Sequence, residues 1–196
     1  FPNLPAAQLH LHKIVPIGAG LGGGSADAAF ALRAINELCG LGLSAEALEG
    51  YARQLGADCA FFIQNTPRLA HGKGDVFEPI ELDLKGISCV VVYPGLHIST
   101  AQAFAGIVPK APAMPLREAL AQPLATWRNT VLNDFEASLA PTHPVLAEIK
   151  QQLYDAGAAY ASLSGSGSSV YGLFPDASEA PTLPWPGEYL VWQGQL

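Results

Sequence analysis

Residues 16–29 read Pro-Ile-Gly-Ala-Gly-Leu-Gly-Gly-Gly-Ser-Ala-Asp-Ala-Ala, a glycine-rich turn that runs directly into a stretch of helix-forming residues. Five of the seven positions 18–24 are glycine. Glycine adopts positive φ at no steric cost, which lets main-chain N–H groups come close to a ligand. Ser25 is placed to cap the next helix, and the first N–H groups and the positive dipole end of a helix attract anions. The stretch therefore predicts a cradle for phosphate.

Other interpretations of the same glycines depend on the residues that come after them. The spacing of Gly18, Gly20 and Gly23 satisfies the dinucleotide-binding pattern, but that fold needs a strand ending in an acidic residue about 20 residues later. Residues 40–44 read Gly-Leu-Gly-Leu-Ser and offer no such strand. A Walker loop needs a lysine directly after its last glycine, where this sequence has Ser25. A glycine turn used only for tight packing stays open on the residues alone.

Length, charge and cysteine content bound the class of protein. The chain has 196 residues and a net charge of −7, so it is long enough to bury a core as one large or two small domains. The acidic balance argues against a nucleic-acid or anionic-membrane partner, and a small ligand is expected. Cys39, Cys59 and Cys89 are widely spaced and predict neither a disulfide framework nor a zinc site, which favours a cytoplasmic location. No apolar run approaches the roughly 20 residues that cross a bilayer.

Hydrophobic periodicity predicts a mixture of helices and strands, and hence an α+β protein. Strands are expected at residues 8–15, 87–93, 160–163 and 170–174. Helices are expected at residues 25–39, from an N-cap at Ser44 to residue 55, through Phe104 after a cap at Ser99 or Thr100, and at residues 129–139 and 144–156. The helix after Ser44 is expected to place Ala47, Leu48, Tyr51 and Leu55 on one apolar face.

One carboxylate stands between a helix end and an apolar run. Residues 55–62 read Leu-Gly-Ala-Asp-Cys-Ala-Phe-Phe, with the acid at Asp58. Burial and nearby cations set the charge state of such a carboxylate, which is how a base for proton removal is tuned. On the residues alone, an aspartate after a helix is more often a cap or a turn residue. Both interpretations of Asp58 stay open at this point.

These motifs together resemble the GHMP kinases, small-molecule kinases whose second motif reads Pro-x-Gly-x-Gly-Leu-Gly-x-x-Ser-Ala. The resemblance spans residues 9–196 and implies ATP at the first glycine turn, with Mg²⁺ shared between phosphate oxygens. The triple glycine before Ser25 is similar to the branch that phosphorylates the 2-hydroxyl of a cytidyl diphosphate sugar alcohol in the non-mevalonate isoprenoid pathway. Another GHMP kinase, of the homoserine or mevalonate type, and a non-catalytic nucleotide-binding module are the alternatives.

The resemblance also implies a fold and its division into domains. Residues 1–83 are expected to be the remainder of a first domain like the second domain of ribosomal protein S5, and residues 84–196 a ferredoxin-like second domain. The family has a further strand-rich segment ahead of the glycine turn, with a lysine that partners the catalytic aspartate. The chain is therefore expected to be a fragment that lacks this portion.

The family motifs assign roles to residues of both expected domains. Asp58 corresponds to the catalytic aspartate of the motif Gly-Ala-Asp-x-Pro, with Ala60 in place of the usual proline, a departure that bears only on the local turn. Thr100 is expected to border the substrate and Phe104 to stack on cytosine, while residues 163–171 resemble the third motif, a loop that packs against the phosphate site. The resemblance places Lys13 beside the adenine, although on the residues alone it could equally be a solvated strand lysine. Nucleotide contacts are implied for Lys13, Pro16, Ile17, Gly18, Ala19, Gly20, Leu21, Gly22, Gly23, Gly24, Ser25 and Ala26.

Residues 133–136, Asn-Asp-Phe-Glu, also resemble a family segment. Helix structure rather than chemistry is expected there, because two carboxylates on a helix usually form a solvated face. The five histidines show no spacing typical of a metal site. No side chain is assigned as a metal ligand.

Overall fold

The computed structural model describes residues 4–175 and 181–196, and its internal contacts divide the chain into two units. Unit 1 consists of Phe1–Ile17 and Gly22–Glu81, and unit 2 consists of Gly18–Leu21 and Leu82–Leu196. The first four residues of the glycine turn thus pack with unit 2, whereas the helix after the turn packs with unit 1.

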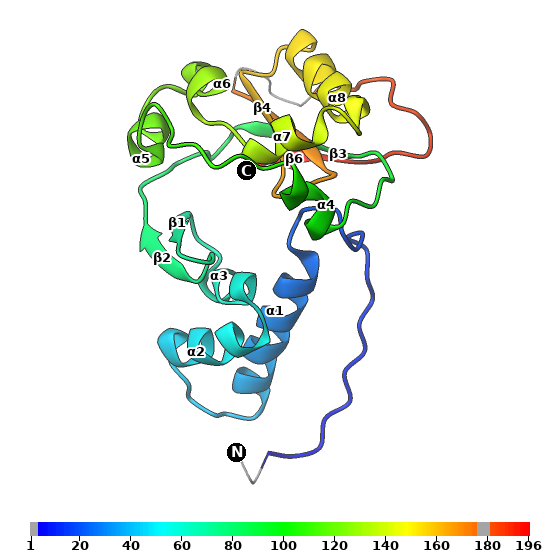
Figure 1. Cartoon of the computed structure of the whole chain (residues 1–196). Helices are drawn as coiled ribbons and strands as arrows, with labels where there is room; N and C mark the ends of the chain where they lie inside the picture. Colours follow the sequence, from blue (N-terminus) through cyan, green and yellow to red (C-terminus); the bar gives the residue numbers. More distant parts are fainter. Residues whose placement is uncertain (1–3, 176–180) are drawn as a thin grey trace. The chain divides into compact units, whose positions relative to one another are not determined.

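Unit 1 is three helices and a short hairpin around a small apolar core. Its elements are α1 (Gly23–Leu38), α2 (Ala45–Leu55), the 3₁₀ turn η1 (Ala57–Cys59), α3 (Phe61–Gln64), β1 (Arg68–His71) and β2 (Val76–Pro79) (Figure 1). The buried residues are Ala29, Leu48, Ala52, Cys59, Ala60 and Ile63. They come from α1, α2 and the segment that joins α2 to the hairpin, so these elements fold onto one another as one body.

The starts of the first two helices follow different rules. Gly22, in the left-handed conformation with φ 65°, is the N-cap of α1, so the helix begins at Gly23 and Ser25 lies inside its first turn. The expected cap at Ser25 is wrong, because the glycine conformation turns the chain into the helix two residues earlier. The cap at Ser44 is confirmed, since its hydroxyl accepts a hydrogen bond from the Ala47 N–H at 3.3 Å.

The buried face of α2 differs from the expected one. Leu48 is buried, but Tyr51 and Leu55 are 41% and 62% exposed. Glu49 and Ala52 take their place in the interior. The apolar pattern could not show this, because the helix buries a carboxylate that is neutralised by arginines: Glu49 accepts hydrogen bonds from Arg53, Gln64 and Arg68.

The expected strand at residues 8–15 is also wrong. The segment is irregular, and its apolar side chains Leu9, Leu11 and Ile14 are exposed. A strand is held by hydrogen bonds to a neighbouring strand and by burial of one face. Among the described residues, none forms a ladder with this segment.

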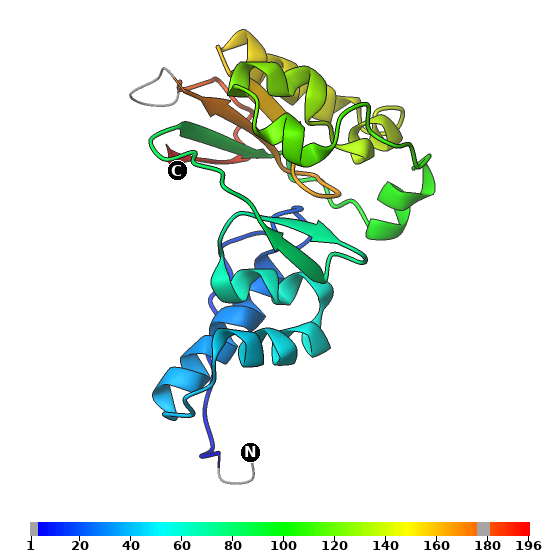
Figure 2. The same ribbon diagram turned by 90° about the vertical axis from the view of Figure 1, so that its left-hand side faces the viewer.

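Unit 2 is built on an antiparallel sheet with the strand order β4-β5-β3-β6 (Figure 2). Its strands are β3 (Ser88–Tyr93), β4 (Tyr160–Leu163), β5 (Val170–Phe174) and β6 (Leu190–Gln195). Its helices are α4 (Thr100–Ala105), α5 (Leu116–Leu120), η2 (Leu124–Thr126), α6 (Trp127–Thr130), α7 (Asp134–Leu139) and α8 (Pro144–Asp155). The strand order, with helices between β3 and β4, is that of a ferredoxin-like sheet. Three of its strands were expected, but β6 and the hairpin of unit 1 were not.

Helices cover both faces of this sheet because its strands alternate apolar side chains between the faces. Val90 and Val170 face a core that includes Ile149 of α8. Cys89 faces the opposite core, which contains Trp127. Burial there raises the pKa of the Cys89 thiol to about 11.

The expected single helix at residues 129–139 is two helices. α6 ends at Thr130 and α7 begins after Asn133, whose Oδ1 accepts a hydrogen bond from the Phe135 N–H at 2.9 Å. An asparagine that caps a new helix cannot also continue the previous one.

Within the described ranges, no helix is both long and apolar enough to cross a membrane.

Candidate active site

The first glycine turn is locked by close contact with the turn between β4 and β5. A Cβ atom on Gly20 would lie 2.2 Å from the Ser164 carbonyl oxygen and 2.7 Å from that of Gly167, and Gly20 has φ 78°. Both facts exclude any other residue at this position. The Ser164 hydroxyl donates a hydrogen bond to the Gly20 carbonyl at 2.8 Å, and the Ser169 N–H donates to the Ala19 carbonyl at 3.0 Å. The expected packing of the third motif against this turn is confirmed.

The N-terminus of α1 presents backbone donors that no side chain caps. Gly22 makes no side-chain capping bond, and the first turn contains no acidic residue. The first N–H groups of a helix have no partner within the helix, so those of Gly23, Gly24 and Ser25 are directed out of its end. A Cβ on Gly24 would meet no atom within 4 Å. This helix end therefore has both the donors and the space that an anion needs.

Lys13 brings a positive charge to the same helix end. Its Nζ lies 2.5 Å from Asp27 Oδ2 of α1 and 3.5 Å from the position that a Cβ on Gly23 would occupy. The ammonium group thus adds to the positive dipole end of the helix. Residues 8–15 are irregular rather than a strand, and the ion pair with Asp27 holds the Lys13 side chain at the start of α1.

Asp58 lies in the 3₁₀ turn η1, directly after Gly56 ends α2. Its side chain is exposed, and its Oδ1 is 3.7 Å from the position that a Cβ on Gly74 would occupy, in the β1–β2 turn. Phe62, one helical turn further along, meets the start of α1: a Cβ on Gly22 would lie 2.8 Å from its ring. Asp58 therefore belongs to the same unit as the N-terminus of α1, which Phe62 of α3 contacts.

Thr100 and Phe104 lie on α4 of unit 2. Ser99 caps this helix through a capping box with Gln102, as one of the two expected caps. Phe104 is 58% exposed, and its ring packs edge-on against Phe135 with 4.9 Å between centroids. Phe104 is thus not a core residue, and its exposed surface is available for stacking.

Some residues that hold the turns were not singled out from the sequence. Ser164, Ser168 and Ser169 act through hydrogen bonds to backbone atoms, and the Ser168 hydroxyl donates to the Leu96 carbonyl at 2.6 Å. The run Ser-Gly-Ser-Gly-Ser-Ser at residues 164–169 was the available signal. No group of three His, Cys, Asp or Glu side chains with the geometry of a metal site occurs in the part of the chain that the structure describes.

Comparison with known proteins shows the family. Residues 2–66 match the GHMP kinases N terminal domain, and residues 116–183 match the GHMP kinases C terminal domain. The chain belongs to the GHMP kinase family. The resemblance noted in the glycine turn, the aspartate motif and the third motif is thereby confirmed for a GHMP kinase in both of its parts.

Individual GHMP kinases of one kind match most of the chain. It is 50% identical over 194 residues to a 4-diphosphocytidyl-2-C-methyl-D-erythritol kinase of Bacteroides thetaiotaomicron, covering 99% of this chain and 71% of that protein. A kinase of the same name from Parabacteroides distasonis is 46% identical over 194 residues, with 99% and 72% covered. A crystal structure of 4-(cytidine 5'-diphospho)-2C-methyl-D-erythritol kinase has a TM-score of 0.69 and 34% identity, covering 82% of this chain but only 59% of that chain.

These GHMP kinases confirm the predicted α+β fold and the predicted class of enzyme, a phosphotransferase of the GHMP kinase family. Their shared name agrees with the predicted branch rather than with a homoserine or mevalonate-type kinase.

Proposed function

We propose that this chain carries the phosphate-binding turn and the catalytic base of an ATP-dependent kinase of the non-mevalonate isoprenoid pathway. Its acceptor would be the 2-hydroxyl of 4-diphosphocytidyl-2-C-methyl-D-erythritol. The observation that carries the proposal is the uncapped N-terminus of α1, which comes directly after a glycine turn locked in place and has Lys13 beside it.

ATP fits this site through its phosphates. The segment from Pro16 to Ala26 supplies a turn in which five of the seven residues 18–24 are glycine, and a helix end with free N–H donors. Such a combination binds phosphate through hydrogen bonds and the helix dipole. Lys13 contributes a positive charge at the same helix end, so we propose that it contacts the phosphates. This differs from the family resemblance, which places the residue beside the adenine.

Asp58 is the proposed general base. It would accept the proton of the acceptor hydroxyl as the oxygen attacks the γ-phosphorus, the bond from that phosphorus to the bridging oxygen breaks, and ADP leaves. Phosphoryl transfer depends mainly on positioning and on stabilising charge, so a single base and a rigid phosphate cradle are the parts that the protein must supply. The Asp58 side chain is exposed, which leaves its carboxylate accessible to a substrate hydroxyl.

Thr100 and Phe104 are the proposed acceptor contacts. Phe104 presents an exposed ring braced by Phe135, an arrangement suited to stacking on a cytosine base. Thr100 is exposed at the start of the same helix and offers a hydroxyl for a polar contact.

Mg²⁺ is proposed as the companion of the nucleotide, held on phosphate oxygens. Magnesium keeps several of its waters and needs few protein ligands when phosphates are present, which suits a chain whose described residues include no cluster of metal-binding side chains. When bound, the ion neutralises charge on the transferring group. The three free cysteines accord with the proposed cytoplasmic location.

Phosphate transfer from [γ-³²P]ATP tests the proposal and its alternatives. The purified intact protein is offered 4-diphosphocytidyl-2-C-methyl-D-erythritol, homoserine or mevalonate in separate reactions. Labelled product from the first acceptor alone is expected. Transfer to another acceptor would reassign the substrate, and ATP binding without transfer to any of them would favour a non-catalytic nucleotide-binding module.

A further inference from the structure

The turn between β4 and β5 is held from its outer side by the start of α7. The Asn133 side-chain Nδ2 donates hydrogen bonds to the carbonyl oxygens of Leu163 at 2.9 Å and Gly165 at 2.8 Å. The same side chain caps α7 through its Oδ1, which accepts from the Phe135 N–H. One asparagine thus joins the beginning of a helix to the beginning of a turn.

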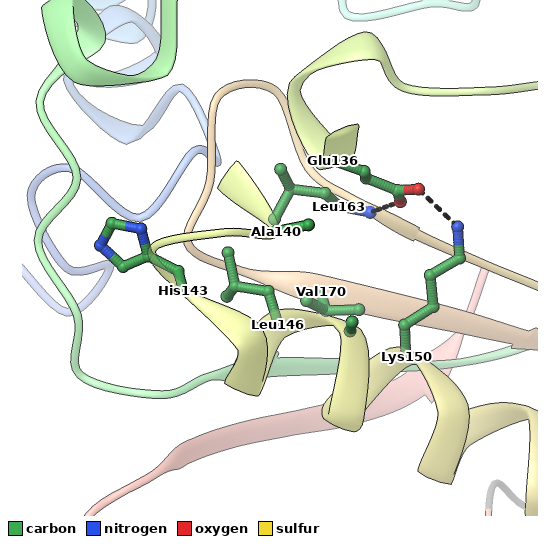
Figure 3. Close-up of a pocket in the computed structure, with 8 residues that line it drawn as sticks. Glu136, Ala140, His143, Leu146, Lys150, Leu163 and Val170 are labelled. Carbon is green, nitrogen blue, oxygen red and sulfur yellow. Dashed lines mark hydrogen bonds and ion pairs between the residues drawn. The ribbon is translucent and has the colours of Figure 1, made fainter. Parts of the chain in front are cut away.

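Glu136, in the first turn of α7, accepts hydrogen bonds from residues at the same end of β4. Its Oε1 accepts hydrogen bonds from the Leu163 N–H at 2.9 Å and the Ser162 hydroxyl at 3.2 Å. Its Oε2 pairs with Lys150 Nζ of α8 at 2.6 Å, so the carboxylate is fixed from both sides (Figure 3). A cavity of about 60 Å³ adjoins this ion pair and is lined mainly by apolar side chains, including Leu146 and Val170.

These contacts fall at the open edge of the sheet. β4 is an edge strand, and the outward N–H and C=O groups of an edge strand lack partners unless something covers them. Asn133 and Glu136 satisfy both backbone groups of Leu163, the last residue of β4, where the strand becomes the turn. The conformation of the turn is therefore set by α7 as well as by the hairpin.

The β4–β5 turn is hydrogen-bonded to the first glycine turn. Ser164 donates to the Gly20 carbonyl, and the Ser169 N–H donates to the Ala19 carbonyl. A Cβ on Gly20 would lie closer than 3 Å to two carbonyl oxygens of the β4–β5 turn, so the two backbones are in direct contact. Movement of residues 163–165 would displace Gly20.

We propose that Asn133 and Glu136 are positioning residues for the phosphate site, acting through the β4–β5 turn on the first glycine turn. The proposal rests on the proposed function only in naming ATP as the ligand. All the contacts that carry it lie within unit 2. The segment that the sequence assigned to helix structure alone would thus set nucleotide affinity.

The test separates the two roles of Asn133. Asn133→Asp keeps the oxygen that caps α7, because aspartate is an equally good N-cap, but it replaces the donor to Leu163 and Gly165 with an acceptor. ATP KM in the intact enzyme is expected to rise by about tenfold, the scale of a lost hydrogen bond with two carbonyls left unpaired. The acceptor KM is expected to stay within about twofold of its original value, since the base and the acceptor contacts are untouched.

Glu136 provides a rescue pair. Glu136→Ala is expected to raise ATP KM by about tenfold, because the Leu163 N–H then loses its partner. Glu136→Gln keeps a side-chain oxygen for that N–H and is expected to restore most of the affinity. Ser138→Ala is the matched control: it removes a hydrogen bond of the same kind from α7, to the Ala103 carbonyl at 2.7 Å, without touching the turn. Its ATP KM is expected to be unchanged.

Hydrogen exchange at the Ser169 amide supplies a readout that needs no ATP. This amide donates to Ala19, so its exchange is expected to be about tenfold faster in Asn133→Asp than in the original chain or in Ser138→Ala. Faster exchange without any ATP turnover by the original protein would overturn the proposed function and leave the positioning role standing. Unchanged exchange and unchanged ATP KM in a folded Asn133→Asp variant would overturn the positioning role. A variant that lowers kcat alone, with ATP KM unchanged, would assign these residues to stability only.

Discussion

The Ser164 hydroxyl donates a hydrogen bond to the Gly20 carbonyl, 2.8 Å away, joining two glycine turns that are 144 residues apart in the chain. Around this bond, the backbone of one turn rests directly on the backbone of the other. The conformation of the proposed phosphate site therefore depends on tertiary packing, although each of the two turns is visible in the sequence.

Gly20→Ala is expected to abolish measurable ATP binding. The new Cβ would lie 2.2 Å from the Ser164 carbonyl oxygen, and alanine resists the φ of 78° that this position requires. Isothermal titration calorimetry with ATP measures the loss. Gly50→Ala is the control, because a Cβ on Gly50, within helix α2, meets no atom within 4 Å. Binding of ATP to Gly20→Ala with unchanged affinity would show that the locked turn is not needed.

Asp58→Asn is expected to lower kcat by about 100-fold or more, the scale of general-base catalysis, while ATP binding persists. The amide cannot take up the proton of the acceptor hydroxyl but has nearly the same shape. Steady-state kinetics and calorimetry on one preparation measure both quantities. Turnover close to that of the original enzyme would exclude Asp58 as the base.

Lys13→Met is expected to weaken ATP binding by about tenfold, since it removes a cation beside the N-terminus of α1. The variant also leaves the Asp27 carboxylate without its partner at the same helix end, which adds repulsion toward phosphate. Lys85→Met is the control: Lys85 is an exposed lysine outside the proposed site. The difference between the two variants is expected to shrink as salt is added, because exposed charges are screened. Equal ATP affinities for both variants at low salt would contradict the assignment.

Glu49→Ala is expected to lower the free energy of unfolding by about 3 kcal/mol, the scale of a broken buried ion pair. The Glu49 side chain is only 8% exposed and pairs with Arg53 and Arg68, of which Arg68 is itself largely buried. Urea denaturation measures the effect. Gln54→Ala, an exposed change on the same helix, is expected to stay within about 0.5 kcal/mol. An equal loss of unfolding free energy in the two variants would show that the ion pairs of Glu49 do not stabilise the fold.

Cys89 is expected to resist alkylation by iodoacetamide at pH 8 in the folded protein, because its pKa is about 11 and the neutral thiol is buried. The unfolded chain ionises this thiol at lower pH than the folded chain does. Stability contributed by the neutral thiol is therefore full below pH 9 and declines as the pH rises toward 11. Mass spectrometry of alkylated peptides is expected to show Cys39, which is half-buried, modified first. Modification of Cys89 at the same rate would contradict its burial.

Local signals in the sequence predicted the elements that depend on local physics. The cap at Ser44, the helix end at Gly56 and the hairpin around residues 164–169 are set by the side chains and glycines within each segment. The glycine turn is predicted to bind phosphate from the same kind of local signal, and this role stays a prediction. The packing of the third motif against it was expected only through the family resemblance.

The predictions that were wrong concern helices and strands whose structure depends on residues far away in the sequence. Glu49 is buried only because arginines from α2 and β1 neutralise it, and the alternation of residues 8–15 makes a strand only when a neighbour is present to pair with it. Asn133 ends one helical region and starts another because its side chain also binds the β4–β5 turn, about 30 residues further along. The periodicity of apolar residues within a segment does not show which distant residues will contact it.

Hydrogen exchange at the backbone amides of residues 22–26, measured with and without ATP, addresses the phosphate site most directly. These amides include the free donors at the start of α1, and ATP is expected to slow their exchange while leaving the amides at the opposite end of the same helix, residues 36–38, unaffected. Binding of ATP with no protection at residues 22–26 would place the nucleotide elsewhere and contradict the assignment.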